Sequence, residues 1–492
     1  MKLSKKLISA MLLGICISNF SIVDAKSSTD KMPSSVEKYE SQKQKLLEKN
    51  RFAADYQLSE DELKVDRKLA RLKSMSDVNY RPDLPFYEFV NVDENLIESD
   101  PLFQFIKAMP KGSNLHTHSS ALLSIEKFYD LCSRIPNLRI DLDGKIPGKL
   151  STSEGIPFNE ADRTKVLKAW TIGIEDSDKR AWDVFEDQFR AIGDVFWIDP
   201  QIYREYYYLG FLEQAQDNLN RLEIRCSTPD WESGDRGKLA AQLLLDAYRG
   251  VQKDYPDFSV KIIVPGHKGK STIEKSQQQF REVIEKEQYL QREVKDESND
   301  FFIGVDLVTE EDAGYPLDTY VPILIEAKNK GFDFDVYLHA GESNSPDNSM
   351  MLDAYLMGTK RIGHGIDLFR YPELAEKIRK HKIALEICPI SNQLLGYTSD
   401  LRNHPAYLYF KEGIPIAIAS DDPAMFNVKG VSYDFYSIVR AWDLNLAEIK
   451  QLCLNSIRYS GGSKSERKKL ESDWRIRWDK FIKSQIHESD SK

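Results

Sequence analysis

The chain has 492 residues, of which 41% are hydrophobic and 30% charged, and its formal net charge is −10. This composition is typical of a folded globular protein, and the length suffices for one large core or for two to three ordinary domains. No long basic stripe runs through the sequence, so we expect no nucleic-acid polymer as a partner.

The first 25 residues have the pattern of a secretory signal peptide. Lysines at positions 2, 5 and 6 precede an apolar stretch that starts at Leu7, and Val23-Asp24-Ala25 supplies a small-residue cleavage site. The apolar stretch is too short and too interrupted to span a membrane. The sequence therefore predicts export to the periplasm or the extracellular space, without a membrane span.

Export permits disulfide bonds, and four cysteines remain once the signal peptide is removed. Cys226 and Cys388 each end an apolar run, which is typical of small core residues. The other two are Cys132 and Cys453. One bridge is compatible with this set and none is required.

Residues 26–100 form a separate region before the main apolar pattern begins. From about residue 35 to 75 the chain is charged, with leucines at helical spacing, and Ser59 followed by three acidic residues predicts a helix start. The stretch "YRPDLPFY" (80–87) predicts an extended linker. Such helices bury little alone, so we expect them to pack on the main domain or on a second subunit.

From residue 101 onward, eight short apolar runs recur, and most are separated by amphipathic helical patterns such as 273–294 and 372–380. The runs are 113–118, 221–227, 258–264, 301–307, 334–340, 361–365, 383–389 and 414–420. Alternation of strand and helix indicates a parallel sheet. Eight strands predict an α/β fold, a closed (β/α)8 TIM barrel over residues 101–485.

An open doubly wound sheet is the alternative fold, but no glycine-rich phosphate loop follows any of these strands. The longest interruption of the pattern, residues 133–180, looks like a loop. We interpret it as an insertion after the first strand, near the mouth of the barrel.

Four of the eight histidines fall at the carboxyl ends of predicted strands. His116 and His118 end the first strand and point to one face, because side chains alternate along a strand. His339 and His364 end two later strands, and Asp421 follows the last. A single histidine at a strand end is usually a core residue, but three imidazoles with a carboxylate suit Zn²⁺.

Three further features of these strand ends bear on chemistry. Gly341 turns the chain after His339 and brings Glu342 back towards the mouth, where burial would raise its pKa and make it an acid; a solvated loop glutamate is the alternative. Neighbouring side chains point apart, so Asp421 can face a metal while Asp422 faces a ligand. The fourth strand ends in "GVDLVTEED", without the lysine that bridges two metals, so we expect one metal per chain.

These motifs together resemble a known family. "MPKGSNLHTH", "YLHAGE", "RIGHG", "CPISN" and "SDDP", in this order, resemble the adenosine deaminase family of metal-dependent barrel hydrolases over residues 101–460. The signal peptide, the helices before the barrel, "AWDVFEDQF" and "GVSYDFY" resemble its secreted branch, the adenosine deaminase-related growth factors. The N-terminal helices of that branch mediate dimerisation, which implies a homodimer here.

The resemblance also implies roles for individual residues. The implied zinc ligands are His116, His118, His339 and Asp421. Glu342 would protonate purine N1, His364 would orient the attacking hydroxide and help move its proton, and Asp422 would hydrogen-bond N7.

On the substrate side, the backbone N–H near Thr309 would approach N3. Gly341 and Trp182 are further candidates for substrate binding.

The chain departs from the family pattern where the sugar would be held. Ser119 and Ser120 stand where the family has an aspartate that contacts ribose, and Thr309 stands in place of a glycine. Trp182 either covers the ribose or packs with aromatic neighbours at helical spacing. His267, after the third strand, either lines the mouth or belongs to a loop.

The expected activity is deamination of adenosine and 2'-deoxyadenosine to inosine and 2'-deoxyinosine with release of ammonia. An enzyme acting on adenine or a modified adenine nucleoside is the nearest alternative. A secreted binding or growth-factor-like protein without turnover is an alternative of another class. Such a protein would need neither Glu342 nor His364.

Overall fold

The computed structural model describes residues 34–49, 57–76, 94–172, 181–231, 234–269, 272–296 and 300–487. The predicted signal peptide (1–25) and linker (80–87) lie outside these residues. The chain divides into two units, residues 1–51 and 52–492. The described part of the first unit is a single helix, α1 (Val36–Lys49).

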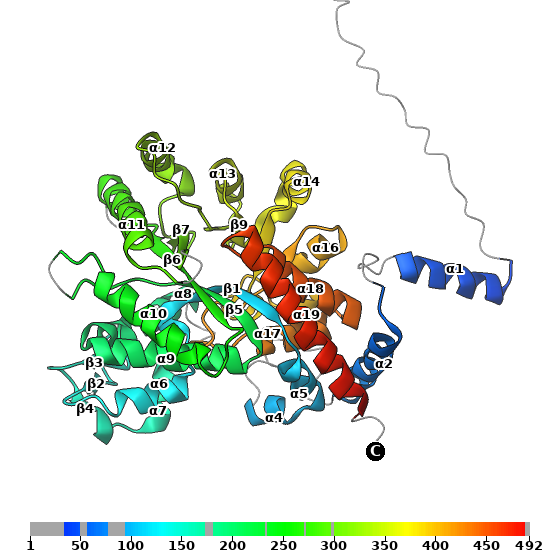
Figure 1. The fold of residues 1–492 in the computed structure, drawn as a ribbon, viewed down its shortest axis with the longest axis horizontal. Coiled ribbons are helices and arrows are strands. Elements are labelled where there is room, and N and C mark those ends of the chain that lie inside the picture. Colours follow the sequence, from blue (N-terminus) through cyan, green and yellow to red (C-terminus); the bar gives the residue numbers. More distant parts are fainter. Residues whose placement is uncertain are drawn as a thin grey trace, which may run out of the picture. The chain divides into compact units, whose positions relative to one another are not determined.

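The second unit contains the predicted barrel (Figure 1). Its strands are β1 (Gly112–His118), β5 (Leu219–Arg225), β6 (Ser259–His267), β7 (Phe302–Val308), β8 (Leu338–Ala340), β9 (Arg361–His364), β10 (Ala384–Ile387) and β11 (Ile416–Ile418). They pair in parallel in the orders β1-β5-β6-β7 and β8-β9-β10-β11. Bridges between Val305 and Val336 and between Thr117 and Asp421 join the two halves. The (β/α)8 barrel is confirmed.

Helices follow the strands and cover the barrel, which explains why the strands read as nearly continuous apolar runs. These helices are α10 (Lys238–Gln252), α11 (Ile273–Glu293), α12 (Val321–Asn329), α13 (Met350–Leu356), α14 (Pro372–His381), α15 (Pro389–Leu394), α16 (Pro405–Lys411), α17 (Ser432–Ala441) and α18 (Leu446–Arg458). The two helices predicted from periodicity, at 273–294 and 372–380, are α11 and α14.

The segment between β1 and β5 includes residues 133–180, the insertion expected from the sequence, but its described part is not all loop. It contains α6 (Ile125–Cys132), α7 (Arg163–Ala169), α8 (Ala181–Ile192), α9 (Pro200–Gln216) and three short strands, β2 (Arg139–Asp141), β3 (Lys149–Ser151) and β4 (Ile156–Pro157). The strands form an antiparallel sheet in the order β3-β2-β4. Strands of two or three residues are too short to give a periodic signal.

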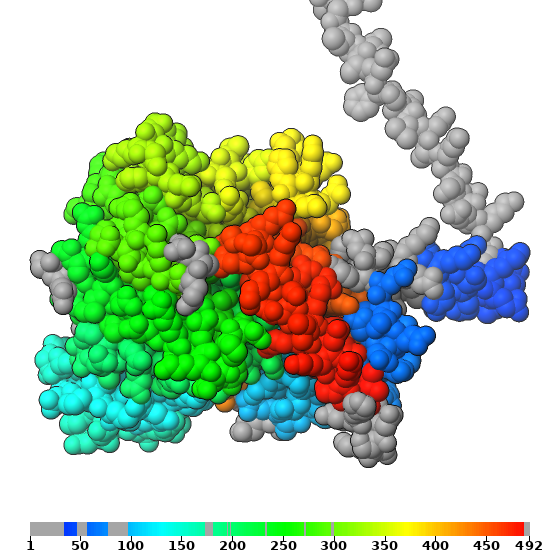
Figure 2. Space-filling view, in the orientation of Figure 1, coloured from blue at the N-terminus to red at the C-terminus, as the bar shows by residue number. Residues whose placement is uncertain are grey.

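The helix predicted to start after Ser59 is α2 (Glu60–Met75), and Ser59 and Glu62 form its capping box. Val65 and Leu69 of this helix are fully buried. Glu62 accepts hydrogen bonds from Trp478 Nε1 and Lys450 Nζ. The helix thus packs on the barrel unit, beside α5 (Pro101–Ala108), α18 and the C-terminal α19 (Lys464–His487). Figure 2 shows α19 along this face with α2 next to it.

The structure describes all four cysteines that follow the predicted signal peptide. Cys132, Cys226, Cys388 and Cys453 are all buried and free, so these four form no disulfide with one another. Within the described ranges, no helix is both long and apolar enough to cross a membrane. A short helix, α4 (Glu94–Ser99), precedes α5.

Candidate active site

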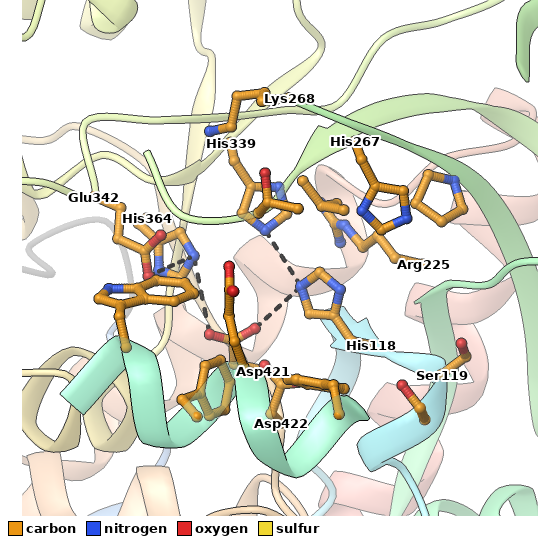
Figure 3. A pocket seen from close by; sticks show the side chains of 18 of the residues that line it. His118, Ser119, Arg225, His267, Lys268, His339, Glu342, His364, Asp421 and Asp422 are labelled. Carbon is orange, nitrogen blue, oxygen red and sulfur yellow. Dashed lines mark hydrogen bonds and ion pairs between the residues drawn. The ribbon is translucent and has the colours of Figure 1, made fainter. Parts of the chain in front are cut away.

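A cavity of about 450 Å³ opens at the carboxyl ends of the barrel strands. Figure 3 shows polar side chains from several strand ends facing one another across it. The predicted residues that line it are His118, Ser119, Ser120, Trp182, His267, Thr309, His339, Glu342, His364, Asp421 and Asp422. His116 lies beneath this surface and is fully buried. Gly341 does not line the cavity, because its place is in the turn behind Glu342.

The four predicted metal ligands converge. Asp421 Oδ1 lies 3.4 Å from His116 Nε2 and 3.3 Å from His118 Nε2. His339 Nε2 lies 3.3 Å from His118 Nε2. The ring nitrogens of the three histidines lie within 4.8 Å of one another. Three imidazoles from two separate strands therefore form one cluster, and the Asp421 carboxylate lies against two of them.

The chemistry of these donors fits a divalent cation. Burial lowers the pKa of His118 and lowers that of His339 to about 3, which keeps both rings neutral with a free lone pair. Burial opposes the charge of Asp421, but the neighbouring imidazoles of His116 and His118 hold its pKa well below the usual value. His116 Nε2 is buried and has no hydrogen-bond partner among the described residues. Neutral imidazoles and an ionised carboxylate are the forms that bind metal.

Two buried carboxylates orient the ligand histidines, and the sequence interpretation missed both. Glu386 Oε2, in β10, lies 2.7 Å from His116 Nδ1, and Asp306 Oδ2, in β7, lies 2.8 Å from His339 Nδ1. Each carboxylate accepts a hydrogen bond from Nδ1–H. The lone pair of each ring is therefore on Nε2, which is directed towards the other candidate ligands. The sequence does contain an indication of their role. An acidic residue inside an apolar run, as in "ALEI" and "GVDL", is rare unless it is paired with another polar group.

Arg225, at the end of β5, joins these two carboxylates. Its Nε lies 2.9 Å from Asp306 Oδ2, and a terminal nitrogen lies 2.6 Å from Glu386 Oε2. Burial alone would raise the pKa of Glu386, but Arg225 and Arg361 hold it well below its usual range. Both carboxylates and Arg225 are completely buried. The histidine orientation is therefore built on a network of buried, paired charges.

Glu342 is 3% exposed, so the alternative interpretation as a solvated loop residue is wrong. Gly341 has φ +67°, and a Cβ there would lie 2.6 Å from Met351, so the turn requires glycine. Glu311 accepts from the backbone N–H of both Gly341 and Ser343, each at 2.7 Å. Burial, then the charges of Asp421 and Glu311, raises the pKa of Glu342 well above its usual value. These effects favour the protonated form of the carboxyl.

Three non-glycine residues at the cavity have left-handed backbone. The φ angles are 90° at Thr309, 65° at His364 and 55° at Asp421. Such conformations cost free energy and gather at functional sites. His364 Nε2 lies 3.4 Å from Glu342 Oε1 and 3.9 Å from Asp421 Oδ2.

The glycines beside His364 make room for side chains of neighbouring strands. A Cβ at Gly363 would lie 2.9 Å from His116 Cε1, and one at Gly365 would lie 2.9 Å from Leu385. Gly363 thus lets the His116 ring pack under the strand. The close approach is to a metal-ligand candidate and not to the His364 ring itself.

Asp422 faces the cavity and is 3% exposed. Burial and the neighbouring charge of Asp421 raise its pKa well above the usual value. Its Oδ1 has no hydrogen-bond partner within the described part of the chain. A neutral carboxyl of this kind can donate a hydrogen bond to an acceptor in the cavity.

The outer wall of the cavity contains the residues for which the sequence left two interpretations open. Trp182, on α8, lines the cavity and also packs against Phe185 at a ring-centroid distance of 5.3 Å, so both interpretations describe it. His267 lines the mouth, and burial lowers its pKa. Glu186 and Lys268 line the wall too, and no sequence pattern distinguishes them from surface charges.

Comparisons with known proteins agree with this geometry. The family model described as "Adenosine deaminase" matches residues 161–475. "Adenosine deaminase 2-A" of Danio rerio is 30% identical over 88% of this chain and 91% of its own length. "Adenosine deaminase 2" of Dictyostelium discoideum is 32% identical over 80% of this chain and 76% of its own.

Among solved structures, an adenine deaminase from Arthrobacter aurescens has a similar fold, with a TM-score of 0.56 at 18% identity. The match covers 77% of this chain and 99% of that one. The family match and the relatives at 30% identity or more span most of the barrel. The chain belongs to the adenosine deaminase family.

Proposed function

We propose that the protein is a zinc-dependent hydrolase that deaminates adenosine and 2'-deoxyadenosine to inosine and 2'-deoxyinosine, releasing ammonia. One observation carries the proposal. Glu342, which is buried and has a raised pKa, and His364 lie at the same cavity as Asp421 and the clustered imidazoles of His116, His118 and His339. Metal ligands, an acid and a polar histidine in one enclosed site are the parts that hydrolysis of an aminopurine needs.

The residues that would hold one Zn²⁺ per chain are His116, His118, His339 and Asp421. When bound, Zn²⁺ lowers the pKa of water to near 7 and so supplies a nucleophile at neutral pH. A second metal has no bridging lysine here, since the strand end at Thr309 carries none. Glu386 and Asp306 hold the ligand rings in place through their Nδ1 protons.

Glu342 acts as the acid. Its protonated carboxyl donates to purine N1, which makes C6 electrophilic and open to attack by the water nucleophile. The neutral carboxyl of Asp422 donates a hydrogen bond to N7, and the backbone N–H near Thr309 approaches N3. Ammonia leaves C6 once the amino group has gained a proton. The exclusion of bulk water from this buried site keeps Glu342 protonated between turnovers.

The sugar side of the cavity supports a nucleoside over a free base. The lining of the cavity also includes Ser119, Ser120, Glu186, His267 and the Trp182 ring. These groups can bind ribose hydroxyls in place of the aspartate that the family has after the second histidine. Free adenine would leave this half of the cavity to water. A binding protein without turnover would have no use for a buried acid beside a histidine.

We also propose the assembly and location that the sequence predicts. Residues 1–25 direct export to the periplasm or the extracellular space and are removed. Residues 26–100 contain the helices of a homodimer contact, and residues 101–485 form the catalytic barrel with its insertion at about 133–180. Because α2 packs on the barrel unit, deletion of residues 26–75 tests both the stability of the barrel and the assembly of the protein into a dimer.

A substrate panel tests the activity. Zinc-loaded protein is mixed with adenine, adenosine, 2'-deoxyadenosine, AMP or 6-methyladenosine, and the 6-oxopurine product is measured by chromatography, because 6-methyladenosine would release methylamine in place of ammonia. We expect adenosine and 2'-deoxyadenosine to have the highest kcat/KM. A higher kcat/KM for adenine or for 6-methyladenosine would assign a different substrate to the enzyme. No turnover of any of the five compounds would overturn the proposal.

A further inference from the structure

A buried chain of three side chains leads from a backbone N–H to the active-site cavity. His404, at the N-terminus of α16, accepts at Nδ1 from the N–H of Ala406 at 3.1 Å. Its Nε2 lies 3.1 Å from Asn392 Oδ1. Asn392 Nδ2 lies 3.1 Å from His364 Nδ1. His404, Asn392 and His364 are each at most 2% exposed, so water does not compete for these contacts.

The backbone N–H fixes the direction of every hydrogen bond in this chain. It can only donate, so His404 Nδ1 carries no proton. Burial lowers the pKa of His404 to about 3, so its ring is neutral and its one proton is on Nε2. That proton goes to Asn392 Oδ1, and the amide therefore presents its NH₂ group to His364. The reverse amide orientation would require a neutral His404 to accept at both nitrogens, which it cannot do.

Asn392 is held firmly in this position by its own backbone. Its N–H donates to the carbonyl of Cys388 at 2.9 Å, and its carbonyl accepts from Tyr397 and Thr398, also at 2.9 Å each. These bonds fix the backbone of Asn392 between His404 and His364, while the orientation of its amide follows from the proton on His404 Nε2.

The orientation of the Asn392 amide determines the tautomer of His364. Because Nδ1 accepts from Asn392, the neutral ring carries its proton on Nε2. This nitrogen faces the cavity, 3.4 Å from Glu342 Oε1 and 3.9 Å from Asp421 Oδ2. A protonated Nε2 is a hydrogen-bond donor, and both of its neighbours are oxygen atoms.

We propose that Asn392 and His404 are positioning residues that lock His364 in its Nε2–H tautomer, so that His364 holds the attacking oxygen by donating a hydrogen bond and does not take its proton. This inference rests on the proposed deaminase function. The protons balance without His364. Glu342 gives its proton to N1, the same carboxylate takes one proton from the attacking water, and the remaining hydroxyl proton passes to the leaving amino group.

The tautomer is measured directly by nitrogen-15 NMR of zinc-loaded protein labelled at histidine, with His364 assigned by its absence in His364→Gln. We expect Nε2 of His364 to be protonated and Nδ1 bare. This readout does not depend on turnover, so it stays valid if the substrate differs from adenosine. A protonated Nδ1 and bare Nε2 in the wild type would overturn the inference.

Asn392→Asp should change kcat in opposite directions depending on whether His364 donates a hydrogen bond or acts as a base. The carboxylate can only accept, so it draws the proton to Nδ1 and leaves Nε2 bare. Loss of one preorganised donor costs about 10²–10³ in kcat, and we expect a fall of at least about 10² per bound zinc. If His364 were the base, the same change would create a more basic ring and would preserve or raise kcat.

The control is Gln393→Glu, which adds the same charge one residue further along α15, where the side chain contacts the carbonyl of Ser399 and not His364. It should keep kcat within about threefold of wild type. Equal loss in both variants would assign the effect to charge and overturn the inference, as would an Asn392→Asp protein within threefold of wild type. If Asn392→Asp does not fold, the wild-type tautomer alone decides.

Discussion

The carboxylate of Glu386 lies 2.7 Å from Nδ1 of His116, at the bottom of the barrel cavity, and neither side chain is exposed. The same carboxylate binds Arg225 and Arg361. An acid in the barrel core thus orients a metal-ligand candidate and is itself held ionised by two arginines. The stability of the core and the geometry of the candidate metal site depend on the same residue.

Glu386→Gln should weaken zinc binding by about 10–100-fold, because the amide no longer fixes the His116 tautomer. It should also lower the free energy of unfolding by about 3–5 kcal/mol, since two buried arginines lose a partner. A competition titration with a chelator and a denaturant titration measure the two effects. Glu213→Gln, which removes a buried acid that bonds Ser124, is the control and should lose stability only. Equal zinc affinity in the two variants would contradict this account.

Glu342→Gln should reduce kcat by about 10²–10⁴-fold, because glutamine fills the same space but cannot donate a proton to N1. Zinc content and adenosine binding should change little. Metal analysis and equilibrium binding on the same preparation provide the comparison with steady-state rates. A variant that keeps more than about a third of wild-type kcat would remove the acid from the mechanism.

Glu186→Gln should lower kcat/KM for adenosine by about 10–100-fold, the effect of losing a hydrogen bond to a charged group. Its neighbour Asp187 provides a matched control, since both acids bind Arg190 but only Glu186 lines the cavity. Asp187→Asn should therefore leave kcat/KM nearly unchanged. If the two variants behave alike, the ribose is held by other groups.

Stability should depend on pH through Glu287, a fully buried acid of α11 far along the chain from the metal-ligand candidates. Burial raises its pKa from 4.5 to about 7. An acid with a raised pKa favours the folded state at low pH, and this advantage is lost as the pH rises from 4.5 to 7. The loss amounts to roughly 3 kcal/mol.

Glu287→Gln should remove this slope and make the protein more stable than wild type at pH 8. Denaturant titrations between pH 4.5 and pH 8 measure the slope. Glu285→Gln, on the same helix, should retain the wild-type slope. An unchanged slope in Glu287→Gln would show that other groups cause the pH dependence.

The barrel was predictable because each strand is a short apolar run that ends in a turn and is followed by a helix. The candidate site was predictable for a related reason, since His116, His339 and Asp421 stand where parallel strands end at one rim. Position along a strand therefore carries information about position in space. The family motifs added roles that spacing alone does not give.

The residues that sequence reasoning missed act through contacts between distant segments. Glu386 and Asp306 belong to different strands from the histidines that they orient. His404 contacts His364 only through Asn392. Glu186 lies on α8, between β1 and β5, and no sequence signal indicates that this helix packs at the cavity. The small sheet at 139–157 escaped because its strands are too short for periodicity to register.

We expect the deamination of adenosine by this protein to depend on a single metal site in each chain. Protein stripped of metal by a chelator is titrated with Zn²⁺, and inosine formation from adenosine is followed at each step by chromatography. We predict no turnover in the stripped protein and a linear rise in rate that stops at about one Zn²⁺ per chain. Full activity in the stripped protein, a break at two metals, or no inosine at any zinc concentration would contradict the account.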